Sequence, residues 1–343
     1  MRYLSAPKLV LLLALLLPTL MIASLGVGTV FISPSEIIHT VSASLAGDSA
    51  NPQYKSILLD IRLPRILLSL LVGAVLASCG VVMQGLFRNA LADPSLIGVS
   101  GGASLGASLT IVSAASTLSV TPFAGLSLVA FGAFVGGFLA TLLVYRVATS
   151  SLGTSVATML LAGIAIGALA GAFNSLLTYF SDNQMLRQIS VWQMGNLSGA
   201  NNTKITLMSA VALCFIVFLP RHVKALNALL LGESEARHLG INVQQVKRNL
   251  ILLIAAGVGV SVALAGLIGF VGLVVPHIVR LIIGPDHRWL LPASALAGAT
   301  LLIIADSVAR VIVLPAELPT GILTALIGAP FFVVLLMGQR RIL

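Results

Sequence analysis

The chain carries few charged residues: Asp, Glu, Lys and Arg make up only 8% of its 343 residues. A soluble domain carries roughly 25% charged residues. A single soluble core cannot enclose a sequence that is 58% hydrophobic. This composition excludes a secreted enzyme, a nucleic-acid-binding domain and a disordered chain. It is typical of a polytopic membrane protein, and we expect the lipid bilayer rather than nucleic acid as its surroundings.

The sequence also has little of the chemistry that catalysis or metal binding requires. Its two cysteines, Cys79 and Cys214, lie far apart in apolar runs, which favours packing roles over a disulfide. No two of the five histidines lie four residues apart, and no lysine follows a glycine. The zinc-protease and phosphate-loop motifs are therefore missing. We predict no catalytic residue and no metal site, so any ATP that drives the protein must bind another chain.

Long stretches without charge dominate the sequence instead. A membrane-spanning helix needs about 20 apolar residues, so these stretches predict an all-α fold with about ten transmembrane helices in one domain, residues 1–343. The stretches are 9–35, 66–87, 94–145, 147–181, 205–220, 249–279, 289–305 and 318–339. Residues 94–145 suffice for two spans with a break near Thr121-Pro122, and residues 249–279 for one full span and a short one.

The basic residues predict the orientation of these helices. The first apolar stretch exceeds the roughly 7–15 residues of a signal-peptide core, so we expect a retained helix. With a cytoplasmic N-terminus, thirteen of the 19 Lys and Arg residues fall inside and six outside. This is the bias that cytoplasmic loops show, and ten helices return the C-terminus to the same side.

Glycines recur four residues apart within the apolar stretches. Such spacing occurs in 98–106, 132–136 and 163–171, and small residues at this spacing let helices approach closely in lipid. Two overlapping G-x-S-x-G patterns within 98–106 resemble a hydrolase nucleophile elbow. Because they lie inside a charge-free run, we interpret them as helix-packing glycines.

The longest charge-dense segment is 221–248. Its charge order, with acidic residues first and basic residues later between two glycines, predicts a short helix. Composition leaves two interpretations equally open, a solvated connector and a docking helix for a cytoplasmic partner. The residues concerned are Gly232, Glu233, Ser234, Glu235, Ala236, Arg237, His238, Leu239 and Gly240.

Three arginines are expected at the outer ends of helices. Arg62 and Arg65 flank a proline, and Arg310 follows Asp306 by four residues on one helix face. The arginines either snorkel to the membrane interface or present cations to an acidic external partner. An acidic residue at the depth of Asp306 needs a partner, so Asp306 and Arg310 are first a structural pair.

A tight cytoplasmic turn is predicted after the second span. Arg88 and Asp93 are placed to tie it together around Asn89, and Pro94 suits the first turn of the next helix.

Over nearly its whole length the chain resembles the permease subunits of FecCD-type bacterial ABC importers, which carry iron chelates, haem and cobalamin. One residue departs from the family pattern: Ala90 occupies a position where proline is usual. The matching motifs are Arg62-Leu-Pro-Arg65, Gly73 through Gln84 to Phe87-Arg88-Asn89, Leu91-Ala-Asp-Pro94, Gly98-Val-Ser-Gly101, Leu231-Gly-Glu233 with Leu239-Gly240, Gly269-Phe-Val-Gly-Leu273 with Pro276-His277 and Arg280, Asp306 with Arg310, Glu317-Leu-Pro319 and Gly328-Ala-Pro-Phe331.

The resemblance implies a type II ABC importer permease in the bacterial inner membrane. It implies ten helices per subunit, a homodimer around a central path, two ATPase subunits that hold ATP and Mg, and an outer substrate-binding protein. Residues 232–240 match the coupling helix that sits in a cleft of the ATPase. Arg62, Arg65 and Arg310 match arginines that pair with acidic residues of the binding protein.

The cargo is the least specified feature. The segment 182–187 and the residues Trp192 to Gly195 look most like the haem branch, with a ferric siderophore or cobalamin as alternatives. We expect Ser175, Thr178, Tyr179 and Met185 to line an apolar path. The rival from another class is an ion-coupled secondary transporter, which needs ionisable groups near the membrane centre. A third interpretation, an intramembrane enzyme, lacks a nucleophile and base.

Overall fold

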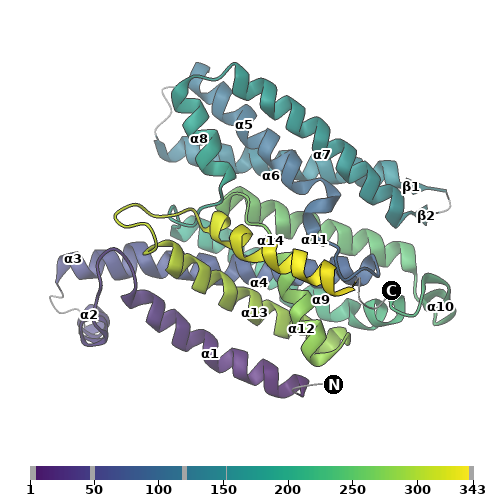
Figure 1. Ribbon diagram of the computed structural model, residues 1–343, viewed down its shortest axis with the longest axis horizontal. Helices are drawn as coiled ribbons and strands as arrows, with labels where there is room; N and C mark the ends of the chain where they lie inside the picture. Colours follow the sequence, from purple (N-terminus) through teal and green to yellow (C-terminus); the bar gives the residue numbers. More distant parts are fainter. Residues whose placement is uncertain (1–4, 47–50, 118–121, 152, 340–343) are drawn as a thin grey trace.

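The structure, a computed structural model, describes residues 5–46, 51–117, 122–151 and 153–339. It is a helical bundle (Figure 1). The α-helices are α1 (Ala6–Gly26), α2 (Pro34–Ala46), α3 (Pro52–Lys55), α4 (Leu63–Leu86), α5 (Val99–Thr117), α6 (Pro122–Ala148), α7 (Val156–Tyr179), α8 (Asn183–Gln193), α9 (Asn202–Leu229), α10 (Glu233–His238), α11 (Val243–Ala265), α12 (Val271–Ile283), α13 (His287–Ala309) and α14 (Thr320–Gln339). A π-helix, η1 (Ser56–Arg62), precedes α4, and a 3-10 helix, η2 (Pro94–Ile97), precedes α5. Two short antiparallel strands, β1 (Thr149–Ser150) and β2 (Gly153–Thr154), precede α7.

By length and composition, seven helical segments of the described chain are able to cross a membrane, and three shorter apolar helices accompany them. The seven are Ala6–Gly26, Pro52–Leu86, Leu128–Ala148, Val156–Tyr179, Asn202–Leu229, Val243–Ala265 and His287–Ala309; the three are Val99–Ser113, Val271–Ile283 and Thr320–Leu335. This set agrees with the predicted all-α membrane fold. The predicted break in 94–145 falls on residues 118–121, which lie outside the described residues.

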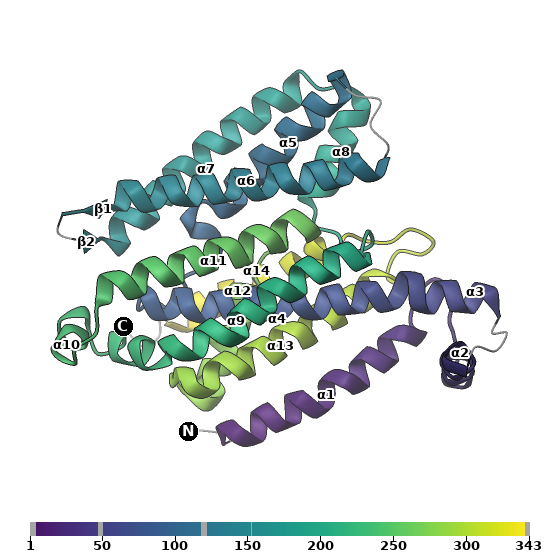
Figure 2. The same ribbon diagram turned by 180° about the vertical axis from the view of Figure 1, so that it is seen from behind.

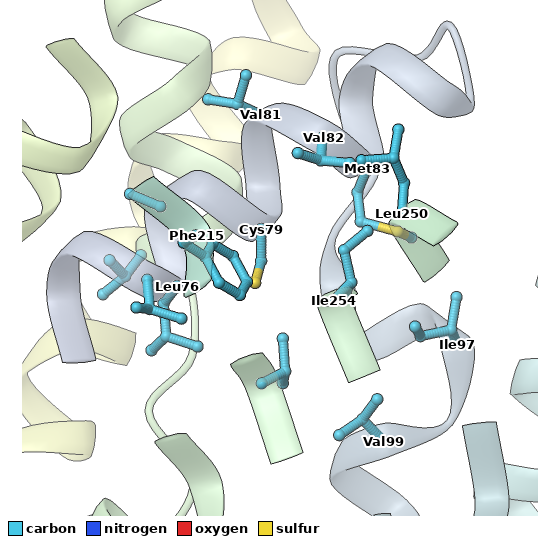
Figure 3. Packing of buried hydrophobic residues seen from close by; sticks show 14 of the residues in the cluster. Leu76, Cys79, Val81, Val82, Met83, Ile97, Val99, Phe215, Leu250 and Ile254 are labelled. Atoms are coloured by element: carbon cyan, nitrogen blue, oxygen red, sulfur yellow. The ribbon is translucent and has the colours of Figure 1, made fainter. Parts of the chain in front are cut away.

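The helices form two layers. Figures 1 and 2 both show α5, α6, α7 and α8 in one layer, with α4, α9, α11, α12 and α13 in the other. Helix α11 joins the layers by contacting α5 and α6. Helix α4 contacts α9, α11, α12 and α13, so it is the centre of the second layer. Figure 3 shows Phe215 beside Cys79 in this core, and Cys79 is fully buried. The predicted packing role of Cys79 is therefore confirmed. The same prediction for Cys214 is wrong, because Cys214 is exposed.

Glycines set the closest helix crossings, including two in α4 that the four-residue spacing did not predict. A Cβ atom at Gly80 of α4 would overlap the carbonyl oxygen of Gly272 in α12, and one at Gly73 would overlap that of Gly298 in α13. The overlapping G-x-S-x-G patterns serve the same purpose, because a Cβ at Gly102 or Gly106 of α5 would overlap a glycine carbonyl of α6. These crossings permit direct backbone contact between helices.

The first apolar stretch does not form a helix through residue 35. Helix α1 ends at Gly26, and the chain then turns so that Ile32 N donates to Gly26 O at 3.1 Å. Helix α2 follows because Ser33 and Glu36 form a capping box, in which Ser33 N donates to Glu36 Oε2 at 2.9 Å and Glu36 N to Ser33 Oγ at 3.4 Å.

The helix predicted from the apolar stretch 205–220 does not end at Pro220. Helix α9 continues through that proline to Leu229. The side chain of His222 bonds Phe218 O at 3.0 Å, one turn earlier, and that of Arg221 bonds Val217 O. These contacts satisfy carbonyls where the helix leaves the apolar region. The charge-dense segment 221–248 is therefore mostly helix, and the connector between α9 and α11 shortens to residues 230–242.

Candidate functional site

The predicted short helix in the connector is present as α10. Gly232 and Gly240 flank it with φ angles of +137° and +79°, a backbone region that favours glycine. Glu233 and Glu235 occupy the first turn, with basic residues in the last turn, as the helix dipole favours. Ala236 is buried against the bundle. The exposed residues of α10 and its two flanks are Leu231, Ser234, Glu235, Arg237, His238, Leu239 and Gly240.

A buried lysine holds α10 in place. Lys247 of α11 is 2% exposed, and its Nζ donates to Glu233 Oε1 at 2.6 Å and to Thr154 O at 2.9 Å. The nearby Gln244 Oε1 accepts from Thr154 N at 3.0 Å. One turn of α11 therefore joins α10 to the β1–β2 hairpin. Nothing in the sequence singles out this contact, because Lys247 is one of thirteen basic residues expected on the cytoplasmic side.

The cytoplasmic turn is built differently from the prediction. Asn89 N donates to Gln84 O at 3.2 Å, and Asn89 Oδ1 accepts from Leu91 N at 2.9 Å. The expected Arg88–Asp93 tie is wrong, because Asp93 Oδ1 instead accepts from Ser95 N at 2.8 Å and caps η2. Burial raises the pKa of the Asp93 carboxyl, and the hydrogen bonds from Ser95 oppose that rise. Arg88 has a φ of +49°.

At the opposite end of the molecule, Asp306 is the centre of an ion cluster. Arg65 Nε donates to both carboxylate oxygens of Asp306 at 3.0 Å, and its Nη2 lies 2.9 Å from Oδ1. Arg65 Nη1 also donates to Glu317 Oε2 at 2.6 Å. The predicted pair of Asp306 with Arg310 is confirmed at 3.3 Å. Thr320 Oγ1 donates to Asp306 Oδ1 at 2.9 Å. The cluster thereby joins α4, α13 and α14.

The three arginines are not exposed cations in this chain. Arg62, Arg65 and Arg310 are 5%, 3% and 2% exposed. Arg62 Nη1 donates to Leu25 O at 2.6 Å, and Arg310 Nη1 donates to Val27 O at 3.1 Å. Neither membrane snorkelling nor free outward charge describes them, because groups of the same chain already pair with all three. Their contact with an external partner stays a prediction.

The four residues expected along the path lie around the junction of α7 and α8. Ser175, Thr178 and Tyr179 lie on the last turns of α7, and Met185 lies on the first turn of α8. Tyr179 is 81% exposed, whereas the Thr178 hydroxyl donates to Asn174 O of its own helix at 2.8 Å. The four share one end of the molecule, and their role in transport stays a prediction.

The geometry describes a membrane-spanning permease: a bundle of apolar helices with a charged helix presented at one end and an ion cluster at the other. Comparison with solved structures agrees. The chain superposes with a TM-score of 0.80 and 35% identity on a metal-chelate type ABC transporter in an inward-facing conformation, covering 97% of this chain and 99% of that chain.

The sequence profile of the FecCD transport family matches residues 13–338, and the chain belongs to this family. It is 44% identical over 329 residues to the hemin transport system permease protein HmuU of Yersinia pestis, covering 96% of this chain and 95% of HmuU. It is 41% identical over 316 residues to the vitamin B12 import system permease protein BtuC of Vibrio vulnificus, covering 92% of this chain and 89% of BtuC.

Proposed function

We propose that the chain is the permease subunit of an ATP-driven importer that moves an iron chelate across the bacterial inner membrane, with haem as the favoured cargo. The similarity to HmuU over 96% of the chain carries this proposal. Permeases of this kind do no chemistry on their cargo, since their work is to alternate between two packings of similar energy. A ferric siderophore or cobalamin is the alternative cargo, and the similarity to BtuC supports the second of these.

The path residues are compatible with haem. Phenolate and thioether groups are among the protein ligands of haem iron, and the junction of α7 and α8 carries the highly exposed Tyr179 and the half-buried Met185. An apolar surround is also present, since Phe173 and Phe180 are 50% and 73% exposed. The same lining also accommodates other large, mostly apolar chelates.

A separate ATPase supplies the energy, and it binds the permease at α10. The helix is exposed at one end of the bundle (Figure 2). Two exposed leucines flank it, Leu231 at 68% and Leu239 at 64%. Exposed apolar side chains in a polar rim are typical of a protein interface. This end and both termini face the cytoplasm in our proposal, and the excess of Lys and Arg residues on that side supports it.

Two copies of the chain form the transport unit, with α7 at the contact. Leu161 and Ile164 of this helix are more than half exposed. A Cβ atom added at Gly167 or Gly171 would meet nothing within 4 Å in the chain. Small residues four apart on an open helix face allow a second helix to approach closely. The path residues at the end of α7 then lie between the two copies.

A substrate-binding protein docks at the end that carries the ion cluster. Glu317, whose side chain is 37% exposed, is the accessible partner of Arg65. An acidic group of the binding protein therefore reaches Arg65 by replacing Glu317, because Asp306 is 1% exposed. The outer loop between α13 and α14 adds apolar surface at Ile312 and Leu314, which are 55% and 57% exposed.

Reconstitution into liposomes tests the proposal. The chain is purified with the ATPase and the substrate-binding protein that the proposal requires, and uptake of haem is measured with ferric siderophore and cobalamin as competitors. We expect haem uptake only when the ATPase and ATP are present on the α10 side, and we expect an excess of ferric siderophore or cobalamin to reduce it only weakly. Uptake by the chain alone under a proton or sodium gradient, without nucleotide, would overturn the proposal in favour of an ion-coupled secondary transporter.

A further inference from the structure

Lys247 occupies a position that the fold of α11 alone does not explain. It lies on the second turn of that helix, and its side chain is almost fully buried beside the connector. Removing an ammonium group from water is costly unless its donors are satisfied. Here Glu233 and the carbonyl of Thr154 accept from it. The next residue, Arg248, is exposed. A basic side chain on this turn of α11 can therefore reach solvent, and the burial of Lys247 is specific to its position.

The two partners of Lys247 belong to two different elements of the chain. Glu233 begins α10, the helix assigned to the ATPase. Thr154 ends the β1–β2 hairpin, and the next residue, Ser155, caps α7 by accepting from Thr158 N at 3.3 Å. The hairpin itself is held by pairing of Thr149 with Thr154. Figure 2 shows α10 and the hairpin at the same end of the bundle.

A second contact fixes the hairpin to the same turn of α11. Gln244 Oε1 accepts from Thr154 N at 3.0 Å. Gly153 allows this approach, because its φ is +110° and a Cβ there would overlap the Gln244 amide. Both backbone polar groups of Thr154 are thus held by α11 side chains, which connects the start of α7 to this turn of α11.

We infer that Lys247 is a positioning residue that transmits the movement of α10 to the start of α7. The inference rests on the proposed function, since it takes α10 as the ATPase contact and α7 as the path helix. Movement of α10 displaces Glu233, the Glu233–Lys247 ion pair displaces the ammonium, and the ammonium displaces Thr154 with the α7 cap. Without Lys247, ATP hydrolysis continues but the path helix no longer follows it.

The test compares Lys247→Met with Arg248→Met, a matched loss of one basic side chain from the adjacent, exposed position. Both are assembled with the ATPase and binding protein in liposomes, and cargo uptake and ATP hydrolysis are measured together. We expect Lys247→Met to lower the cargo moved per ATP by about tenfold, the size expected for loss of one charged hydrogen bond. Arg248→Met is expected to match the wild type.

A merely structural role would lower uptake and hydrolysis by the same factor and leave their ratio unchanged, which would overturn the inference. Glu233→Ala provides a second variant. The Glu233 side chain is 34% exposed, so removing it creates a smaller buried cavity than removing the buried Lys247 side chain would. It should reproduce the changed ratio, and the double variant should be no worse than Lys247→Met alone. Additive effects would also overturn the inference. Failure of the wild type to transport with ATP would instead reject the proposed function.

Discussion

Asn in place of Asp306 removes one negative charge from the outer ion cluster with almost no change of shape. The Asp306 carboxylate pairs with two guanidinium groups, those of Arg65 and Arg310, which are 3% and 2% exposed. After the substitution only Glu317 remains as a carboxylate partner, and it reaches Arg65 alone. Breaking one side of a buried ion pair costs about 3–5 kcal/mol. Because the amide oxygen still accepts a hydrogen bond, we expect about 3 kcal/mol, the lower end of that range.

This loss is measurable as a shift of the thermal midpoint in detergent. A large domain shifts by about 2 °C per kcal/mol, so Asp306→Asn should lower Tm by about 6 °C. Cys79 is fully buried and reports unfolding through a thiol-reactive fluorescent dye. The exposed Cys214 is first replaced by serine to remove the background signal. Asp60→Asn is the control, since Asp60 is exposed and occurs in no ion pair found among the described residues.

The control is expected to stay within about 0.5 kcal/mol of the parent protein. An Asp306→Asn protein with the Tm of the control would refute the reasoning. It would mean that water or lipid headgroups reach the two guanidinium groups and replace the carboxylate. The arginines would then count as solvated groups, and the outer cluster would not stabilise the contacts among α4, α13 and α14.

Three further outcomes are expected. Leu239→Asp should reduce capture of the tagged ATPase more than tenfold without loss of folded protein, since the side chain is exposed; unchanged capture would remove α10 from the interface. Glu317→Gln should strengthen binding of the substrate-binding protein by releasing Arg65, and weaker binding in a pull-down would contradict the exchange of partners. Gly80→Ala should lower stability by about 1–3 kcal/mol or more through overlap with α12. Gly269→Ala, whose added Cβ would meet no neighbour and which lies outside the proposed dimer contact, should be close to neutral in the same thermal assay.

The sequence was sufficient to locate the helices that cross the membrane. An apolar span is a local property, because every segment in hydrocarbon must satisfy its own backbone and avoid charge. Even the short second span within 249–279 is present, as α12. The prediction failed where helices leave the apolar region. Charge in 221–229 suggested a connector, yet α9 continues through those residues, since a helix in water is free to carry charge.

The ion pairs could not be predicted in the same way. Arg310 lies four residues from Asp306, and helical periodicity alone brought that pair together. Arg65 is separated from Asp306 by 241 residues and contacts it only because α4 crosses α13. Lys247 and Thr154 are 93 residues apart. Such contacts depend on the packing of whole helices, which a single sequence without relatives does not specify.

The glycine crossings of α4 have a consequence for how the molecule changes shape. Backbone touches backbone between Gly80 and Gly272 and between Gly73 and Gly298, so sliding or parting at either crossing opens an empty gap. Helices α4, α12 and α13 therefore behave as a rigid frame. The layer of α5 to α8 meets α11 of the other layer partly through side chains, such as Phe134 near Gly259. Direct backbone contact between the layers is found beyond the end of α8, where Asn196 N donates to Ala265 O at 2.7 Å. We therefore expect opening and closing to move one layer against the other about the contact beyond α8, and spin labels within the frame should keep constant separations.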